Sequence, residues 1–171
     1  FVDFAVSHFK LQFENKSASN DVTNAYSNKI DELSFLKHKF PAVKNLDHAF
    51  DLLKSNFIAP KYITIVHGDL TLENLIKTND NKICMIDFLD DYSNGIYTDI
   101  SKIFQDIQGG WSFFNRNKYE PPISQSNLSV RLLVMKKKII SEIRKIDNNE
   151  RLIETILYIL LIHYIRIIPY I

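Results

Sequence analysis

Two short stretches decide what fold we expect of this chain: VHGDLTLEN at residues 66–74 and ICMIDF at residues 83–88. In the first, a β-branched run leads into a glycine and an aspartate, Asp69, and an asparagine follows five residues later. In the second, another short apolar run ends at Asp87. Between the two stretches lies TNDN, residues 78–81, which is typical of a hairpin turn. The sequence therefore predicts a small β-hairpin that brings the two stretches together.

The oxygen-bearing side chains of these stretches are expected to share one cavity at the mouth of the hairpin. Gly68 gives the loop the backbone freedom of a tight turn, so that Asp69 and Asn74 can face the same space. Asp87 leaves the second arm of the hairpin beside them. Two carboxylates and an amide oxygen are ligands suited to Mg²⁺ shared with phosphate oxygens. The alternative is a solvated turn with incidental acidic residues, and the agreement of the spacings favours the site.

Helical periodicity surrounds this β segment on both sides. Residues 62–66 are expected as a strand and residues 14–24 as a loop, and nothing else in the first 60 residues has a strand pattern. The fold class is therefore α+β and predominantly helical, with residues 1–171 forming a single domain around a small hairpin insert. The expected helices cover about residues 1–13, 28–39, 46–55 with Asn45 as its cap, 98 to the Gly109-Gly110 break, 125–146 and 149–168.

Composition excludes several classes of protein. With 21 Lys and Arg against 20 Asp and Glu, the net charge of +1 gives no strong field for nucleic acid or for an anionic membrane surface. The sole cysteine, Cys84, expected in the core, excludes an internal disulfide and fits a cytoplasmic protein. The apolar segment 152–171 contains Glu154, His163 and Arg166, so it is expected to be a buried helix rather than a membrane span.

The pattern H-G-D-x-x-x-x-N, I-D-F, D-I-S, within residues 66–102, resembles that of the aminoglycoside phosphotransferase and choline kinase family, the small-molecule branch of the protein-kinase-like fold. The resemblance implies that Asp69 is the catalytic base for the acceptor hydroxyl and that Asn74 and Asp87 bind the Mg²⁺ ions on the nucleotide phosphates. It also implies that His67 braces the loop.

The resemblance further implies that Asp99 is a buried carboxylate tying the catalytic loop to the helix that follows it. In this family a β-rich N-terminal lobe supplies the adenine site, the loop over the phosphates and a lysine. The first 60 residues of this chain lack such a pattern. The chain is therefore expected to be the C-terminal lobe of a protein-kinase-like fold, with the hairpin carrying the catalytic loop and an N-terminal lobe supplied by sequence outside it.

The expected function is transfer of the γ-phosphate of ATP or GTP to a hydroxyl of a small molecule such as a sugar, an amino alcohol or a related metabolite. A polycationic aminoglycoside is disfavoured, because the chain is balanced in charge. Two alternatives are a non-catalytic, kinase-like binding or regulatory module and a metal-dependent phosphohydrolase with His67 and Asp69 as ligands. Candidates for the acceptor pocket are Asp90, Trp111, Tyr119, His163 and Arg166.

Overall fold

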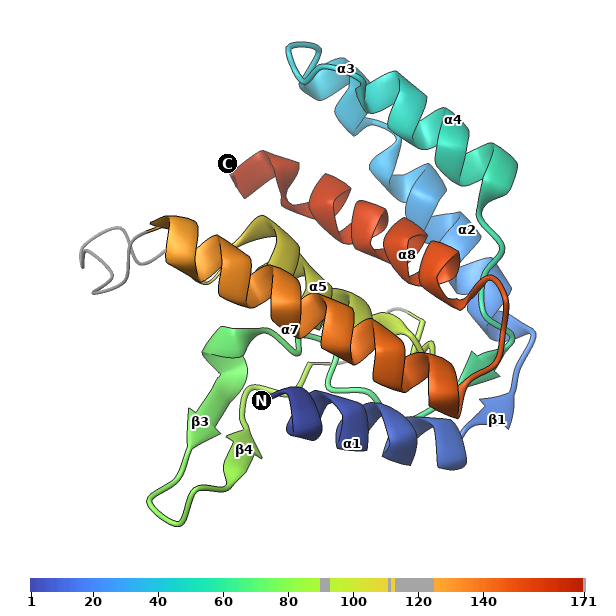
Figure 1. Ribbon diagram of the computed structural model, residues 1–171. Helices are drawn as coiled ribbons and strands as arrows, with labels where there is room; N and C mark the ends of the chain where they lie inside the picture. Colours follow the sequence, from blue (N-terminus) through green and yellow to red (C-terminus); the bar gives the residue numbers. More distant parts are fainter. Residues whose placement is uncertain (90–92, 111, 113–124, 171) are drawn as a thin grey trace.

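The structure, a computed structural model, describes residues 1–89, 93–110, 112 and 125–170, with side chains omitted at 125–127. Within these residues the fold is mostly helical with two small antiparallel sheets, which makes it α+β (Figure 1). The helices are α1 (Val2–Glu14), α2 (Asp21–Leu33), α3 (Leu36–Lys39), α4 (Leu46–Asn56), α5 (Thr98–Gly109), α7 (Gln125–Ile146) and α8 (Leu152–Ile167), with 3-10 turns at Leu72–Asn74 (η1) and Ile168–Tyr170 (η2). The strands are β1 (Ser17–Ala18), β2 (Tyr62–Ile63), β3 (Leu75–Lys77) and β4 (Ile83–Met85).

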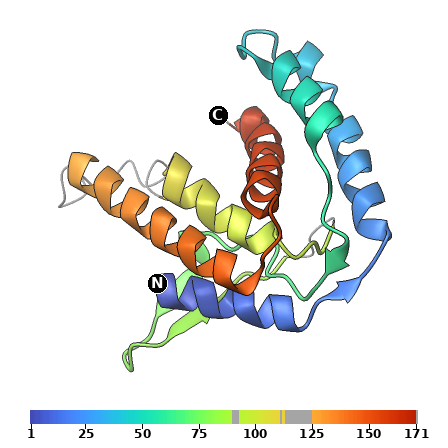
Figure 2. The ribbon, with the colours of Figure 1, turned by 45° about the vertical axis from the view of Figure 1, so that its right-hand side comes forward.

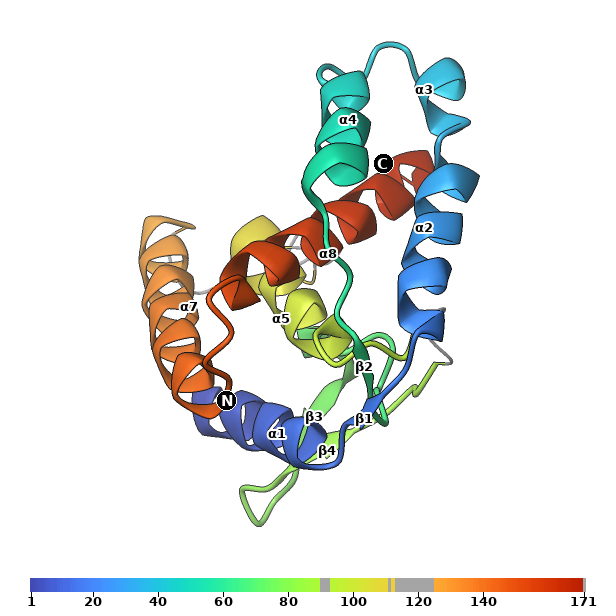
Figure 3. The same ribbon diagram turned by 90° about the vertical axis from the view of Figure 1, so that its right-hand side faces the viewer.

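Helix α5 lies at the centre of the molecule. Every residue from 98 to 107 is buried. Helix α8 packs on α5, α1 and α7 also contact it, and α2 contacts both α8 and α4. Figures 2 and 3 show α8 running between α5 and the helices α2 and α4. Because α5 is surrounded, its polar side chains must find partners inside the protein.

Amphipathic spacing explains how the outer helices bury one face. In α2 the buried residues are Val22, Tyr26, Ile30 and Leu33, three or four positions apart, which is the spacing of one helical stripe. Helix α8 is more apolar and is buried over a wider arc: eight of its sixteen residues are buried. The segment Leu152–Tyr170 is also long and apolar enough to cross a membrane by length and composition alone.

The expected hairpin is present. Strand β3 pairs with β4 in antiparallel register, Leu75 with Met85 and Lys77 with Ile83. The turn between them is closed by the Thr78 N–H, which donates to the Lys82 carbonyl at 2.9 Å. The hairpin projects from the helical body beside α1 (Figure 1), and its base leads directly into the two loop segments that carry the predicted site.

The strand expected at residues 62–66 is shorter in the structure, because the strand that pairs with it is very short. Strand β2 covers only residues 62–63, not 62–66, because β1 offers just two residues to pair with it. Beyond that point the chain pairs with a loop instead, and the Thr64 N–H donates to the Asn94 carbonyl at 3.0 Å. The presence of β1 also corrects the prediction that residues 14–24 form a loop and that no strand precedes residue 60.

Three local predictions in and beside the helical region were wrong. Residues 28–39 do not form one helix: α2 begins at residue 21 and ends at residue 33, and α3 follows it. Asn45 does not cap α4 through its side chain; it has a left-handed backbone with φ of 63°. Cys84 is exposed, because it is the middle residue of β4 and points away from the face that contains Ile83 and Met85.

Candidate active site

The loop at residues 67–74 is anchored to the start of α5 by one carboxylate. Asp99, which has no exposed surface, accepts the backbone N–H of His67 at 2.8 Å and that of Gly68 at 3.0 Å. Gly68 has a φ of 80°, a left-handed conformation that glycine adopts without the steric cost of a side chain. The sequence prediction for Asp99, a buried carboxylate that ties this loop to the following helix, agrees with this geometry.

Helix α1 supplies two more donors to the same carboxylate. His8 Nε2 lies 2.9 Å from Asp99 Oδ2, and Gln12 Nε2 donates to that oxygen at 2.7 Å. Four hydrogen bonds thus compensate for the burial of one charged group. His8 and Gln12 were not predicted as part of the site; the available signal was two polar residues at i and i+4 on the same helix, one of which, Gln12, is buried.

A second aspartate of α5 anchors the other end of the loop. Asp106 is fully buried and accepts the backbone N–H of Leu72. It also accepts from both the N–H and the hydroxyl of Ser112, each at 2.7 Å. Asp99 and Asp106 are seven residues apart, which is about two helical turns, so both carboxylates lie on one face of α5. The sequence analysis found the first of them but not the second.

His67 connects the loop to the segment that contains Asp87. Its Nε2 lies 2.7 Å from the Ile86 carbonyl, so Nε2 carries the hydrogen, and its Nδ1 accepts the backbone N–H of Asp69 at 3.3 Å. The ring also packs against Phe88, with centroids 4.4 Å apart. Both ring nitrogens are therefore engaged within the protein, which argues against His67 as a metal ligand of a phosphohydrolase.

Asp69 and Asn74 lie side by side. The turn η1 brings Asn74 back toward the start of the loop, where its Nδ2 donates to the Asp69 carbonyl at 2.8 Å and lies 3.2 Å from Asp69 Oδ2. The Asp69 side chain is 32% exposed. Because the amide nitrogen of Asn74 is used on Asp69, the amide oxygen is the atom left for a metal ion.

Asp87 is held between the two ends of the loop. On one side the Ile86 N–H donates to the Asn74 carbonyl at 3.0 Å, and on the other the Leu89 N–H donates to the His67 carbonyl at 2.9 Å. Asp87 is exposed and has a φ of 58°, an uncommon backbone conformation for a residue with a side chain. Such conformations persist where neighbouring contacts enforce them, and they concentrate at functional sites.

Lys102 is a site residue that the sequence analysis missed. Its Nζ lies 2.9 Å from Asp69 Oδ1, and its side chain is 10% exposed. It occupies the same face of α5 as Asp99 and Asp106, three and four positions away from them. The i, i+3, i+7 spacing of these three charged residues, alongside the apolar positions of the helix, was the signal that could have revealed this face.

The predicted acceptor-pocket residues receive little support. Asp90, Trp111 and Tyr119 lie outside the described residues. His163 is buried between α8 and α5, with Nε2 3.0 Å from Ser101 Oγ, and burial together with the charges of Lys102 and Arg166 lowers its pKa well below the ordinary value. This is a core position, which argues against a role in acceptor binding. Arg166 is half-buried near the end of α8.

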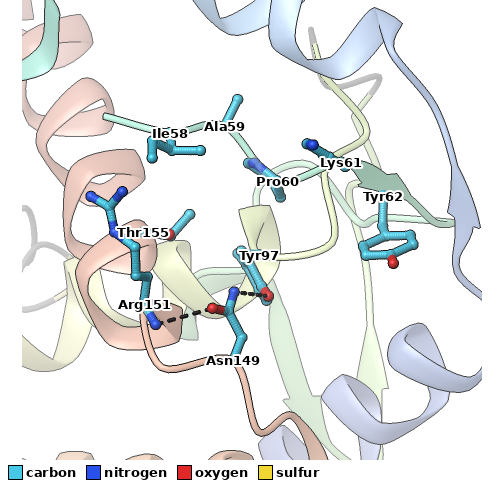
Figure 4. A pocket seen from close by; sticks show the side chains of 9 residues that line it. All are labelled: Ile58, Ala59, Pro60, Lys61, Tyr62, Tyr97, Asn149, Arg151 and Thr155. Carbon is cyan, nitrogen blue, oxygen red and sulfur yellow. Dashed lines mark hydrogen bonds between the residues drawn. The ribbon is translucent and has the colours of Figure 1, made fainter. Parts of the chain in front are cut away.

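A surface hollow of about 230 Å³ lies elsewhere, between residues 58–62 and the start of α8 (Figure 4). Asn149 Nδ2 lies 3.4 Å from the Tyr97 hydroxyl on its wall. Arg151, also on the wall, is bound to Glu154 at 2.8 Å. None of the loop residues lines this hollow, so we place the candidate site at the loop, where Asp69 lies beside Asn74 and the backbone on either side of Asp87 is bound.

By their chemistry, the donor atoms at the loop are of the kind that Mg²⁺ shares with a bound ligand. In the described part of the chain there is no group of three His, Cys, Asp or Glu residues arranged to hold a metal. Mg²⁺ is commonly bound by one or two carboxylates, with water and substrate phosphates completing the octahedron. The Asp87 carboxylate and the Asn74 amide oxygen are ligands of that kind.

Comparisons with known protein families, with curated proteins and with solved structures found no match to this chain.

Proposed function

We propose that this chain is the catalytic, C-terminal lobe of a cytoplasmic, Mg²⁺-dependent small-molecule kinase of the aminoglycoside phosphotransferase and choline kinase type. It would transfer the γ-phosphate of ATP or GTP to a hydroxyl of a sugar, an amino alcohol or a related metabolite. One observation carries the proposal. The loop places Asp69 beside Asn74, and the carbonyls at its two ends bind the segment on either side of Asp87.

The chemistry of phosphoryl transfer asks mainly for positioning and for neutralisation of charge. Asp69, partly exposed beside Asn74, would orient the acceptor hydroxyl and accept its proton. Asn74 and Asp87 would hold Mg²⁺, which would neutralise charge on the nucleotide phosphates. Asp99, Asp106 and His67 touch no reacting atom in this scheme and serve to hold the loop in shape.

The direct test is transfer of labelled γ-phosphate from ATP and from GTP, with Mg²⁺, to a panel of small hydroxyl compounds. The protein is measured both as this chain and together with its natural upstream sequence. We expect Asp69→Asn to lower kcat by about 10²–10⁴-fold, the range typical of a lost general base, and chelation of Mg²⁺ to abolish transfer. The control Asp51→Asn changes an exposed carboxylate on α4 and should leave the rate unchanged. Full activity of Asp69→Asn would refute the assignment of the base.

The second candidate is a kinase-like module that binds nucleotide without turnover. The small extent of β structure favours an absence of turnover: within the described residues the sheets are two-stranded and their strands two or three residues long, far less than the β-rich lobe that would complete a kinase active site. Calorimetric titration with Mg²⁺ and nucleotide separates the candidates. Binding that Asp87→Asn weakens, without transfer in either form of the protein, would favour the module over the enzyme.

A further inference from the structure

The ion pair of Lys102 is unusual because its carboxylate partner does not belong to the same helix. Its side chain is almost buried, and a buried ammonium group requires an opposite charge or hydrogen-bond acceptors. The usual partner on a helix would be a carboxylate three or four positions away. Asp99 and Asp106 stand at those two positions, but both are occupied by backbone N–H groups of the loop. Among the described residues, Lys102 instead forms its ion pair with the loop residue Asp69, at 2.9 Å.

We infer that Lys102 is a positioning residue for the transfer reaction: it fixes one carboxylate oxygen of Asp69 so that the other is presented to the acceptor hydroxyl. The inference rests on the proposed function. Lys102 binds Oδ1, while Oδ2 lies 3.2 Å from the amide nitrogen of Asn74. The carboxylate is therefore held from two sides. Each oxygen has two lone pairs, and Oδ2, which faces only a neutral amide in this pair of contacts, retains one for the acceptor.

The backbone of Lys102 is held in place as firmly as its ammonium group. It lies in the fully buried part of α5, between the two aspartates that bind opposite ends of the loop. Three residues on one helix face thus join the helix to the loop, and one of them, Lys102, contacts the side chain of the proposed base itself. A general base acts only when it is aligned within hydrogen-bond distance of the proton that it removes.

Phosphoryl transfer at this site requires no proton from Lys102. The acceptor oxygen forms a bond to the γ-phosphorus, and the bond from that phosphorus to the bridging oxygen breaks. The electron pair of the broken bond leaves with the nucleoside diphosphate, and the hydroxyl proton moves to Asp69. Lys102 acts by position and charge only, so arginine in its place should preserve much of the rate while an uncharged side chain of similar length should not.

The kinetic test compares Lys102→Met, Lys102→Arg, Asp69→Asn and the double variant Asp69→Asn/Lys102→Met in the active form of the protein. We expect Lys102→Met to lower kcat about 10- to 100-fold, with the KM for nucleotide changed less than about twofold, and Lys102→Arg to stay within about fivefold of wild type. Because Lys102 acts through Asp69, the double variant should be no slower than Asp69→Asn. Multiplying effects in the double variant, or an unchanged kcat in Lys102→Met, would overturn the inference.

A matched control separates this role from the loss of any ion pair. Lys54 Nζ also lies 2.9 Å from an aspartate oxygen, Asp31 Oδ1, but both side chains are more than half exposed and belong to α4 and α2. Lys54→Met should leave kcat unchanged. Circular dichroism shows whether Lys102→Met folds. If it does not, the kcat of Lys102→Arg is compared with that of wild type, and the kcat of the double variant with that of Asp69→Asn. Neither of these variants leaves an unpaired buried charge in the site.

A cross-link tests the geometry without relying on activity. A carbodiimide joins a carboxylate and an amine in direct contact as an amide, so the wild-type chain should yield an Asp69–Lys102 cross-linked peptide by mass spectrometry, absent in Lys102→Met. Absence of that peptide from wild type would overturn the pair itself. If the cross-linked peptide forms but untreated wild-type protein transfers no phosphate, the proposed function is contradicted, whereas an active enzyme indifferent to Lys102→Met would contradict only the role of Lys102.

Discussion

Asp99 shows how a buried charge can organise a loop. A carboxylate without exposed surface is costly unless hydrogen bonds replace its hydration. Here the replacements come from two backbone N–H groups of the loop and from two side chains of α1. The same contacts that compensate for burial also fix the start of the loop at residues 67–74 relative to α5. The stability of the protein and the shape of its site therefore depend on one side chain.

We expect Asp99→Ala to lower the free energy of unfolding by about 3 kcal/mol or more, because several buried donors lose their acceptor and each costs about 1–3 kcal/mol. Urea unfolding measures the change. Asp51→Ala, at an exposed position of α4, is the control and should stay within about 0.5 kcal/mol of wild type. A cost for Asp99→Ala no larger than that of the control would contradict the hydrogen-bond network described for it.

His163 is a buried titratable group at the interface of α5 and α8. Ser101 Oγ donates to the Thr98 carbonyl at 2.6 Å, so its oxygen serves as acceptor for His163 Nε2 at 3.0 Å. The opposite ring nitrogen, Nδ1, is buried and makes no hydrogen bond to any residue that the structure describes. Burial, with the charges of Lys102 and Arg166, lowers the pKa of His163 well below its ordinary value of 6.5.

This shift predicts a loss of stability in acid. When the pH falls below about 6.5, the unfolded chain takes up a proton at residue 163 while the folded protein does not, so the free energy of unfolding decreases. One such group contributes at most about 1.4 kcal/mol per pH unit. Urea unfolding at a series of pH values should therefore give a steeper acid dependence for wild type than for His163→Gln. Parallel curves would show that His163 titrates normally in the folded state.

At the scale of elements, α5 is the helix on which the site is assembled. Its apolar residues pack against α8, α7 and α1, and one remaining face presents Asp99, Lys102 and Asp106 to the loop. The sequence predicted the helix from the periodicity of Ile100, Ile103, Phe104 and Ile107. The family resemblance gave Asp99 as a buried carboxylate, but the sequence analysis did not predict that Lys102 and Asp106 are buried on the same face, because a charged stripe on a helix is usually solvated. The loop packed over that face, together with His8 and Gln12 of α1 and with Ser112, gives the charges their partners.

A second junction between elements is tight enough to test by substitution. Gly95 pairs with Ile63 of β2 and lies against α2, where a Cβ at residue 95 would be 2.8 Å from the hydroxyl of Tyr26. Tyr26 is fully buried and bonded to Thr98 at 3.2 Å, so it cannot swing into solvent.

Gly95→Ala should therefore lower the free energy of unfolding by about 1–3 kcal/mol, the usual cost of overpacking. In a Tyr26→Phe background, which lacks the clashing hydroxyl, the added cost of Gly95→Ala should be smaller. A double-mutant cycle of urea unfolding measures this difference. Equal costs in the two backgrounds would show that the methyl group is accommodated in another way.

At the scale of the whole molecule, α8 joins the two halves of the helical body. It packs against α5 on one side and against α2 on the other (Figure 2). Its apolar composition has two interpretations, a core helix and a membrane-spanning one, and the two make different predictions for substitution. In a core helix, the cost of removing a side chain should follow burial within the protein.

We expect Ile159→Ala to lower the free energy of unfolding by about 2–5 kcal/mol in aqueous buffer, because Ile159 has no exposed surface and its loss leaves a cavity. Leu157→Ala, on the same helix at a side chain that is 40% exposed, should cost clearly less. Urea unfolding without detergent measures both. Similar costs at the two positions would contradict the packing of α8 described for this structure.

The sequence by itself determined the local features of this protein. The hairpin, the loop with Asp69 and Asn74, the position of Asp87 and the helices with strong apolar periodicity all depend on residues close together in the chain, where turn chemistry and side-chain spacing decide the structure. It failed at β1, at the start of α2 and at Cys84, where short or polar stretches take their structure from elements that pack against them.

Only the tertiary structure decided how the site is held. The partners of Asp99 in α1 are 91 and 87 residues away in sequence, and the N–H that Asp106 accepts is 34 residues away. The pairing of Lys102 with Asp69 is of the same kind. Local spacing carries no information about which helix face will meet which loop. That meeting depends on how the helices pack around α5 to bury their apolar surfaces.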